Sequence, residues 1–172
     1  MKANTSCMKY SRSNTELLVS KVGHETSLSL LLHKEGLAEE CTINEPVING
    51  DDYMDSSSNW TELDNEKPKS VDIIFRLENN AIQFTECKLN IKPKLSSLSQ
   101  RQLVDKVENT GLQLSKALGI NSFLETPPTP ILFSNEVIER AKFRFRRWYP
   151  GKKESSCPFV AMRVADFIEA FF

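Results

Sequence analysis

Three residues in the stretch VDIIFRLENNAIQFTECKLN, residues 71–90, have side chains that could perform chemistry: Asp72, Glu86 and Lys88. The rest of the stretch is largely apolar, and charges in a buried strand are costly unless they pair or hold a metal. Two neighbouring carboxylates can both stay ionised with a divalent cation between them, and their oxygens suit Mg²⁺ or Mn²⁺. A bound metal activates water and stabilises charge on a phosphate, while the Lys88 ammonium could orient that water. These residue types therefore point to hydrolysis of phosphodiester bonds.

A β-hairpin is the element that must position these side chains. Residues 71–77 and 81–91 are strand-like, and the ENN at 78–80 supplies turn chemistry between them. Both faces of the predicted hairpin are largely apolar, as in a central strand pair. The alternative is an edge hairpin in which Lys88 simply forms a salt bridge with one of the carboxylates.

The expected turn fixes which residues lie opposite each other. With a three-residue turn, Leu77 faces Ala81 and Asp72 faces Glu86, with Cβ atoms about 4.5–5.5 Å apart. The two-residue period of a strand places Lys88 on the same face. A turn shifted by one residue would set Asp72 opposite Cys87 or Lys88 and weaken the cluster.

The remaining pattern alternates helices with strands. The 172 residues are predicted to form one domain, 1–172, with a mixed sheet flanked by helices on both faces. The expected elements are helical pieces over 14–38 interrupted at Gly23, a short strand within 41–48, a helix between a Ser99 cap and Gly119, a strand at 129–133, a helix at 135–148, a strand at 159–164 and a helix at 165–172.

The order Asp72, then Glu86-Cys87-Lys88, on a hairpin followed by a capped helix resembles the PD-(D/E)XK nuclease superfamily, the restriction-endonuclease-like fold. The order of elements over about residues 14–134 fits this resemblance. Val71 stands where the family has proline, a position that varies within it.

The resemblance implies an α/β protein with a restriction-endonuclease-like core that acts as a Mg²⁺- or Mn²⁺-dependent endonuclease on DNA or RNA. It implies that Asp72 and Glu86 bind metal, that these two and Lys88 are catalytic, and that the backbone carbonyl of Cys87 touches the metal. Many members also place an acidic residue on the first helix, for which Glu25 is the candidate metal ligand.

Several supporting assignments leave alternatives open. Glu16 is the second candidate for the helix acid, and a carboxylate at a helix start is also favoured by the helix dipole. His24 is either a surface residue or an extra manganese ligand, as in viral cap-cleaving endonucleases of this superfamily. Gln102 either aids the site or completes a capping box with Ser99, and Lys106 is expected on a solvated face.

A basic and aromatic segment, RAKFRFRRWYPGKK at 140–153, contains seven basic residues and no acid. Arg140, Arg144 and Arg147 share one helical stripe and are the predicted nucleic-acid-binding residues, since basic side chains contact phosphates and aromatics stack on unpaired bases. The alternative is an amphipathic helix with its aromatic residues inward and its charges outward.

Residues 42–70 contain seven acids and many Ser and Asn residues, and they are expected to form a long acidic loop. This loop supports the rival interpretation, a non-catalytic nuclease-like protein that binds nucleic acid or a protein partner, such as an immunity protein that neutralises a basic toxin. Oligomeric state is open, although cutting both strands of a duplex would favour a homodimer.

Composition limits which partners, metal sites and cellular location are expected. Hydrophobic residues make up 40% of the chain and charged residues 26%, and the net charge of −1 indicates no class of partner. The four cysteines form no CxxC pair, which argues against a zinc site and fits a reducing cytoplasm. Without a signal-peptide pattern or a long apolar run, a cytoplasmic protein that does not contact membranes is expected.

Overall fold

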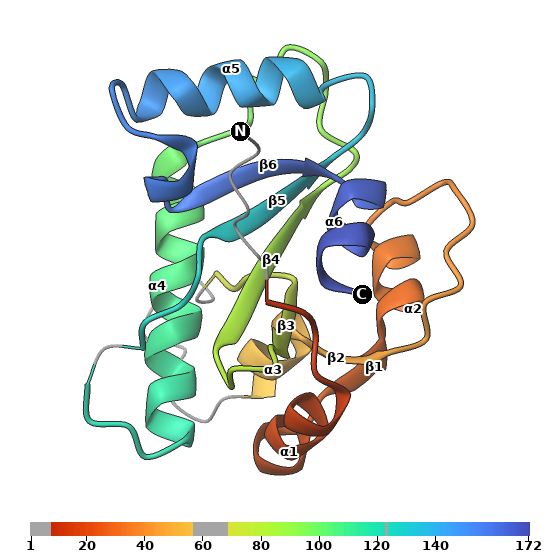
Figure 1. The fold of residues 1–172 in the computed structure, drawn as a ribbon, viewed down its shortest axis with the longest axis vertical. Coiled ribbons are helices and arrows are strands. Elements are labelled where there is room, and N and C mark those ends of the chain that lie inside the picture. Colours follow the sequence, from red (N-terminus) through yellow and green to blue (C-terminus); the bar gives the residue numbers. More distant parts are fainter. Residues whose placement is uncertain (1–7, 57–68, 123) are drawn as a thin grey trace.

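The computed structural model describes residues 8–56, 69–122 and 124–172, which form an α/β structure around one open mixed sheet (Figure 1). Neighbouring strands are antiparallel from β1 to β4, and β4, β5 and β6 are parallel. Within the described residues the sheet has six strands in sequential order: β1 (Glu25–Ser27), β2 (Pro46–Asn49), β3 (Ile73–Arg76), β4 (Ile82–Lys88), β5 (Thr129–Phe133) and β6 (Phe159–Arg163).

Helices connect most of these strands. Those in the described residues are α1 (Arg12–Val22), α2 (Leu28–Lys34), α3 (Gly50–Ser56), α4 (Gln100–Ala117), α5 (Ile138–Trp148) and α6 (Val164–Phe171), with a short 3₁₀ helix at Glu154–Ser156. None of them is both long and apolar enough to span a lipid bilayer.

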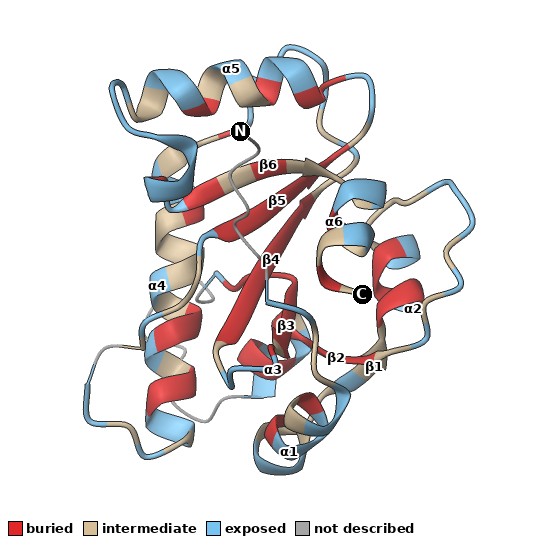
Figure 2. Ribbon diagram, in the orientation of Figure 1, coloured by how far each residue is buried: buried red, intermediate tan, exposed pale blue. Residues whose placement is uncertain are grey.

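Alternate residues of the strands pack against helices on opposite faces, so the sheet is covered on both sides, as predicted (Figure 2). On one face, Phe75 of β3 and Leu132 of β5 pack with α2 and α6. On the other, Phe84 of β4 packs near α1 and α4, and Phe133 of β5 packs against α5. The strands that carry the candidate chemistry are therefore central rather than at an edge.

The hairpin has the predicted register. Ile73 lies opposite Thr85, and Arg76 lies opposite Ile82. The Leu77 N–H donates to the Ala81 carbonyl at 3.0 Å across the turn. The same register continues to set Asp72 opposite Glu86.

The helical prediction for 14–38 was partly wrong. Gly23 adopts a φ of 74° and ends α1, as expected from the break in the pattern. The next residues then pair with β2, with Glu25 opposite Ile48, instead of starting a helix. Glu25 is therefore a strand residue, because the helix begins only after the Ser27 cap.

The predicted acidic loop at 42–70 was also partly wrong. The short strand expected within 41–48 is present as β2 at Pro46–Asn49, but α3 follows it directly and buries side chains such as Tyr53. The stretch 57–68 lies outside the described residues. Later elements match more closely: Ser99 caps α4, β5 covers 129–133 and β6 covers 159–163, while α5 starts at Ile138 rather than at 135.

Candidate functional site

The two hairpin carboxyl groups are almost completely buried. Asp72 is 5% exposed and Glu86 is 1% exposed. The Cys87 backbone N–H donates to Asp72 Oδ2 at 2.6 Å, which fixes the carboxyl group against β4. Cys87 points its own side chain into the hydrophobic core on the other face of the sheet, where burial raises the pKa of the thiol well above its ordinary value. Its sulfur is therefore a neutral thiol in the core.

Two lysines hold Glu86. Lys88 Nζ lies 2.7 Å from Glu86 Oε1, and Lys106 Nζ lies 2.6 Å from the same oxygen. Lys106 also approaches Asp72 Oδ1 at 3.9 Å. The expectation that Lys106 lies on a solvated face was wrong, because α4 packs across the hairpin and turns this residue inward.

A second group of acids meets Asp72. Glu35 follows the last turn of α2, and Asp51 lies in the first turn of α3. One carboxylate oxygen from each of Glu35, Asp51 and Asp72 lies within 4.8 Å of the other two. This is the spacing of a group of oxygen atoms that could share one cation.

Gly50 allows Asp51 to reach this position. Its N–H donates to the Asp72 carbonyl at 3.0 Å, and a Cβ atom at residue 50 would overlap the carbonyl oxygen of Val71. The backbone at the start of α3 thus lies directly against the segment that leads into β3. Ser70 Oγ donates to Asp51 Oδ1 at 2.7 Å and orients that carboxylate.

The electrostatics of the cluster disfavour a full set of ionised acids. Burial, with a further contribution from the Glu86 charge, raises the pKa of Asp72 to about 8, although Lys106 and the Cys87 N–H oppose the shift. Burial and then the Asp51 charge raise the pKa of Glu35. Burial lowers the pKa of Lys106, but the charges of Glu86 and Asp72 outweigh it, so the net shift is upward and the ammonium stays charged.

The donor set fits a divalent cation. Glu86 Oε2 is buried without a hydrogen-bond partner, an uncommon state for a buried carboxylate oxygen. The site contains more carboxyl groups than ammonium groups, and with every carboxyl ionised, as a bound metal would require, the difference of two negative charges equals the charge of one divalent ion. These groups are the carboxyls of Glu35, Asp51, Asp72 and Glu86 and the ammoniums of Lys88 and Lys106.

Other residues singled out in the sequence lie outside this cluster. Glu25 is exposed on β1, and Glu16 forms an exposed ion pair with Arg12 at 2.9 Å. His24 Nε2 lies 2.7 Å from Ser56 Oγ. Gln102 is exposed, and its backbone N–H donates to the capping Ser99 Oγ.

The predicted arginine stripe lies on α5. Arg140 donates to the Pro93 carbonyl at 3.2 Å, and Arg144 donates to the Leu95 carbonyl at 2.6 Å. Arg147 is exposed at the far end of the same stripe. The amphipathic alternative is true in part, because Phe145 is buried beneath the helix while most of the arginine stripe remains at the surface.

Sequence reasoning missed Glu35, Asp51 and Lys106 as site residues. Lys106 carried a usable signal, because it lies three residues after the apolar Leu103 and four before Thr110, both of which are buried on α4. Asp51 carried a weaker one, a Gly-Asp pair directly after an apolar strand. Glu35 carried none, since a carboxylate at a helix end is ordinary on a protein surface.

Comparisons with known proteins identify no relative. No family model, curated protein or solved structure matches the chain. The restriction-endonuclease-like core therefore stays a prediction, and the described architecture is α/β with a mixed open sheet.

Proposed function

We propose that the protein is a metal-dependent nuclease that hydrolyses phosphodiester bonds of DNA or RNA. The observation that carries this proposal is the meeting of the buried Asp72 with the half-buried Glu35 and Asp51, directly beside Glu86 and Lys88. Such a concentration of carboxyl groups is costly in a protein interior unless a function requires it.

Glu35, Asp51 and Asp72 would hold the ion, with Glu86 offering its unpartnered oxygen from the adjoining strand. All are hard oxygen donors, so Mg²⁺ or Mn²⁺ is the expected class of metal. When bound, such an ion lowers the pKa of a coordinated water and neutralises charge on the phosphate. The Cys87 carbonyl remains a predicted further ligand.

The two lysines have different roles in this proposal. Lys88 follows Glu86 on the same face of β4 and is the more exposed ammonium, with 27% of its side chain accessible against 20% for Lys106. Lys88 is thus the cation that can reach a phosphate oxygen and stabilise the charge that develops as water adds to phosphorus and the ester bond breaks. Lys106 holds Glu86 in place from α4.

Thermal melting with and without excess MnCl₂ tests the metal site, because a ligand that binds only the folded state raises its stability. Wild type should melt at a higher temperature with Mn²⁺, and Asp72→Ala should lose that increase. Asp51→Ala should lose most of it, whereas Asp52→Ala, which changes an exposed neighbour on the same helix, should retain it.

The same assay distinguishes Glu35 from Glu25, the acid that the sequence predicted as the further metal ligand. Glu35→Ala should reduce the Mn²⁺ response, and Glu25→Ala should leave it intact. If the Glu25 variant alone loses the response, the ligand set proposed here is wrong. Nuclease assays of wild type and Lys88→Ala then test catalysis: equal, metal-independent cutting by both would exclude the proposed mechanism.

One observation favours a second candidate, a nuclease-like protein that binds a partner without catalysis. Lys106 already places a cation beside Glu86 and near Asp72, so the hairpin carboxylates are partly neutralised by the protein itself. In that case Mn²⁺ should raise the melting temperature of neither wild type nor Lys106→Met, and replacing Lys88 should leave partner binding unchanged.

A further inference from the structure

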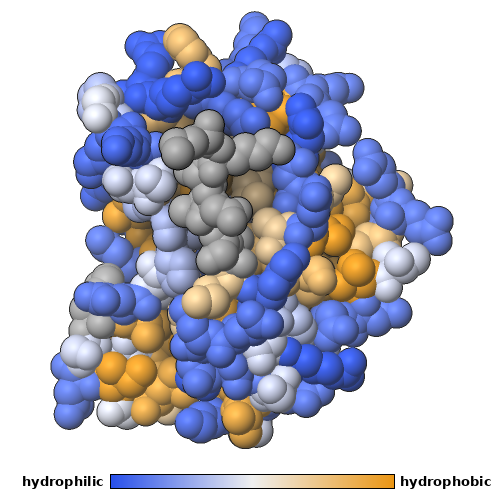
Figure 3. Space-filling model, viewed as in Figure 1, coloured by the Kyte–Doolittle hydropathy of each residue, from blue (hydrophilic) through white to orange (hydrophobic). Residues whose placement is uncertain are grey.

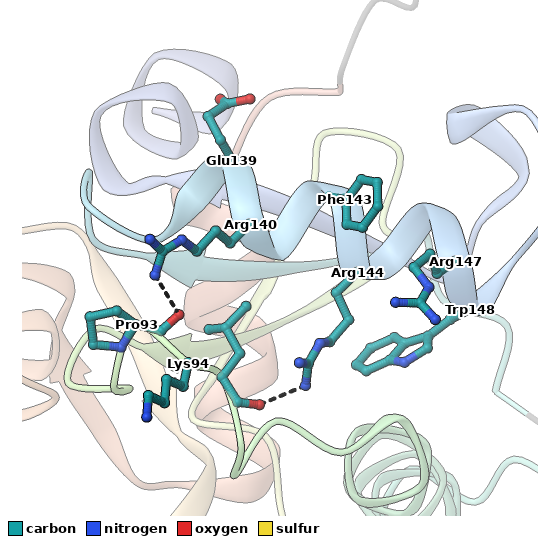
Figure 4. A pocket seen from close by; sticks show the side chains of 9 residues that line it. Pro93, Lys94, Glu139, Arg140, Phe143, Arg144, Arg147 and Trp148 are labelled. Atoms are coloured by element: carbon teal, nitrogen blue, oxygen red, sulfur yellow. Dashed lines mark hydrogen bonds between the residues drawn. The ribbon is translucent and has the colours of Figure 1, made fainter.

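A groove lies between α5 and the loop that follows β4. It encloses about 820 Å³, and its lining includes Lys94, Arg140, Phe143, Arg144, Arg147 and Trp148 (Figure 4). This volume is within the range of about 300–1,000 Å³ typical of small-molecule sites, so the groove has room for a nucleotide-sized group.

The groove is built from the segments that leave the sheet beside the candidate metal centre. Lys88 of β4 pairs with Phe133 of β5, and these two parallel strands end together. The chain after β4 forms the 89–95 loop, and the chain after β5 leads into α5 (Figure 1). Ligands of open α/β sheets bind beyond the carboxyl ends of parallel strands, which is where this groove lies.

Arginine hydrogen bonds fix the two walls relative to each other. Arg140 and Arg144 bind the carbonyls of Pro93 and Leu95 from across the groove, as Figure 4 shows. Each contact uses one terminal nitrogen, and a guanidinium has further N–H donors. These arginine side chains therefore hold the two walls in place and still present N–H donors to the groove.

The groove is strongly cationic. Lys94 and Arg147 are both exposed, and among the described residues the Arg147 side chain has no hydrogen-bond or ion-pair partner. Glu139 is the acid at the groove, but it points away from the Pro93–Lys94 loop in Figure 4 and pairs with Lys142 at 3.4 Å and Arg163 at 3.9 Å. Hydrophilic residues also cover most of the visible surface over α5 (Figure 3).

Two aromatic rings interrupt this cationic surface. Phe143 is 60% exposed in the middle of the exposed face of α5, where a free phenyl ring is unfavourable in water. Trp148 is half-buried and stacks on the buried Phe145 at 5.0 Å with an angle of 21° between the rings. Phe145 thus supports one side of the indole, and another part of the ring lines the groove.

We infer that this groove binds a single-stranded nucleic acid, with phosphates on Arg147 and Lys94 and unpaired bases stacked on Phe143 and Trp148. Alternating cations and aromatic rings are the chemistry by which proteins hold single strands. A duplex keeps its bases stacked on each other and would present only phosphates to the two rings. The inference rests on the proposed nuclease function for its assignment of nucleic acid as the substrate, and it narrows that substrate to unpaired strands.

The test measures binding of fluorescently labelled oligothymidylate and oligouridylate, and of a matched duplex, by anisotropy in EDTA. Without metal, binding is separated from cleavage. Wild type should bind single strands more tightly than the duplex, and Phe143→Ala should weaken single-strand binding by about five- to a hundredfold. Arg147→Ala should lower the slope of log affinity against log salt by about 0.7.

Arg146→Ala is the matched control, because Arg146 is the exposed neighbour on α5 but lines a different cavity with Tyr149 and Lys152. It should change single-strand affinity by less than the Phe143 variant does. Equal losses in the Arg146 and Arg147 variants, equal affinity for the duplex, or no binding of either single strand would overturn the inference. A preference for oligothymidylate or oligouridylate would support it and identify DNA or RNA.

Failure of the two proposals can be distinguished. Single-strand binding that depends on Phe143, with no Mn²⁺ response and no cleavage, would overturn the proposed nuclease activity. It would retain the groove as a site that binds single-stranded nucleic acid. Cleavage that requires Asp72 but is insensitive to Phe143→Ala and Arg147→Ala would support the nuclease activity and exclude this groove as the substrate-binding site.

Discussion

At the scale of single residues, Asp72 is a carboxyl group held by several neighbours in a buried position. It lies within reach of a backbone N–H, a lysine and two other acids, yet it is almost inaccessible to water. Burial raises its pKa to about 8, so a proton occupies this group near neutral pH in the absence of metal. Proton and metal ion are therefore expected to compete for the same oxygen atoms.

This competition predicts a pH-dependent stability. The folded state keeps the Asp72 proton up to about pH 8, whereas an unfolded aspartate loses its proton at about pH 3.9. Between these values the folded state binds more protons, so the Asp72 contribution to the free energy of unfolding falls as pH rises. Without divalent ions, the melting temperature of Asp72→Asn relative to wild type should increase by several degrees between about pH 5 and 9.

Asparagine is chosen because its side-chain oxygen can still accept the Cys87 hydrogen bond while having no proton to lose in this range. The Mn²⁺ response of wild type should grow as pH rises towards 9, because metal binds the ionised carboxylate. If the melting temperatures of the two proteins instead change in parallel across this pH range, Asp72 titrates as an ordinary aspartate.

At the scale of elements, the position of α3 against the start of β3 decides whether Asp51 joins the site. Gly50 permits that close approach because it has no Cβ atom to meet the Val71 carbonyl. Two backbone segments separated by about twenty residues of sequence are thus in direct contact through one hydrogen bond from Gly50 to Asp72.

Gly50→Ala should therefore both destabilise the protein and impair the metal site. Overlap with a backbone carbonyl forces the segments apart, at a cost of about 1–3 kcal/mol in the free energy of unfolding. The displacement should also reduce the Mn²⁺-induced rise in melting temperature, because Asp51 moves with α3. Urea unfolding and melting with MnCl₂ measure the two effects.

Gly111→Ala provides the control. Gly111 is buried within α4, but an added Cβ would only make ordinary contact with the Phe84 ring at 3.9 Å. Alanine is the better helix former, so this variant should be neutral or more stable by up to about 1 kcal/mol. If both glycine variants behave alike, the close approach at Gly50 does not control the site.

At the scale of the whole molecule, the C-terminal helix seals one face of the sheet. Phe167 is completely buried, and its ring centroid lies 6.1 Å from that of Phe75 on β3. Phe171 reaches the same ring, and its carbonyl accepts a hydrogen bond from the Tyr10 N–H. The two ends of the described chain thus meet over the strand that follows Asp72.

Two substitutions of the same type should separate this core role from the surface role proposed for α5. Phe167→Ala should lower the free energy of unfolding by about 3–5 kcal/mol, because it removes a large side chain from a closed core. Phe143→Ala removes an exposed ring and should change it by less than about 0.5 kcal/mol. Urea unfolding measures both, and a large loss in Phe143→Ala would mean that the ring has a structural role.

Sequence alone determined the features that depend on neighbouring residues. Strand alternation and the ENN turn gave the register that sets Asp72 opposite Glu86, and the Ser99 cap with its apolar stripe located α4. The strands at 129–133 and 159–163 followed from short apolar runs. These signals are local, because side-chain period, turn chemistry and capping act within a few residues along the chain.

Only the tertiary structure decided which distant residues complete the site. Glu35 directly follows α2, Asp51 lies in α3 and Lys106 lies in α4, and each meets the hairpin because of how these helices pack on the sheet. The position of Glu25 was likewise decided by pairing with β2, which overrode a helical pattern. Contacts between segments tens of residues apart depend on the packing of whole elements, and local sequence patterns do not specify which elements pack together.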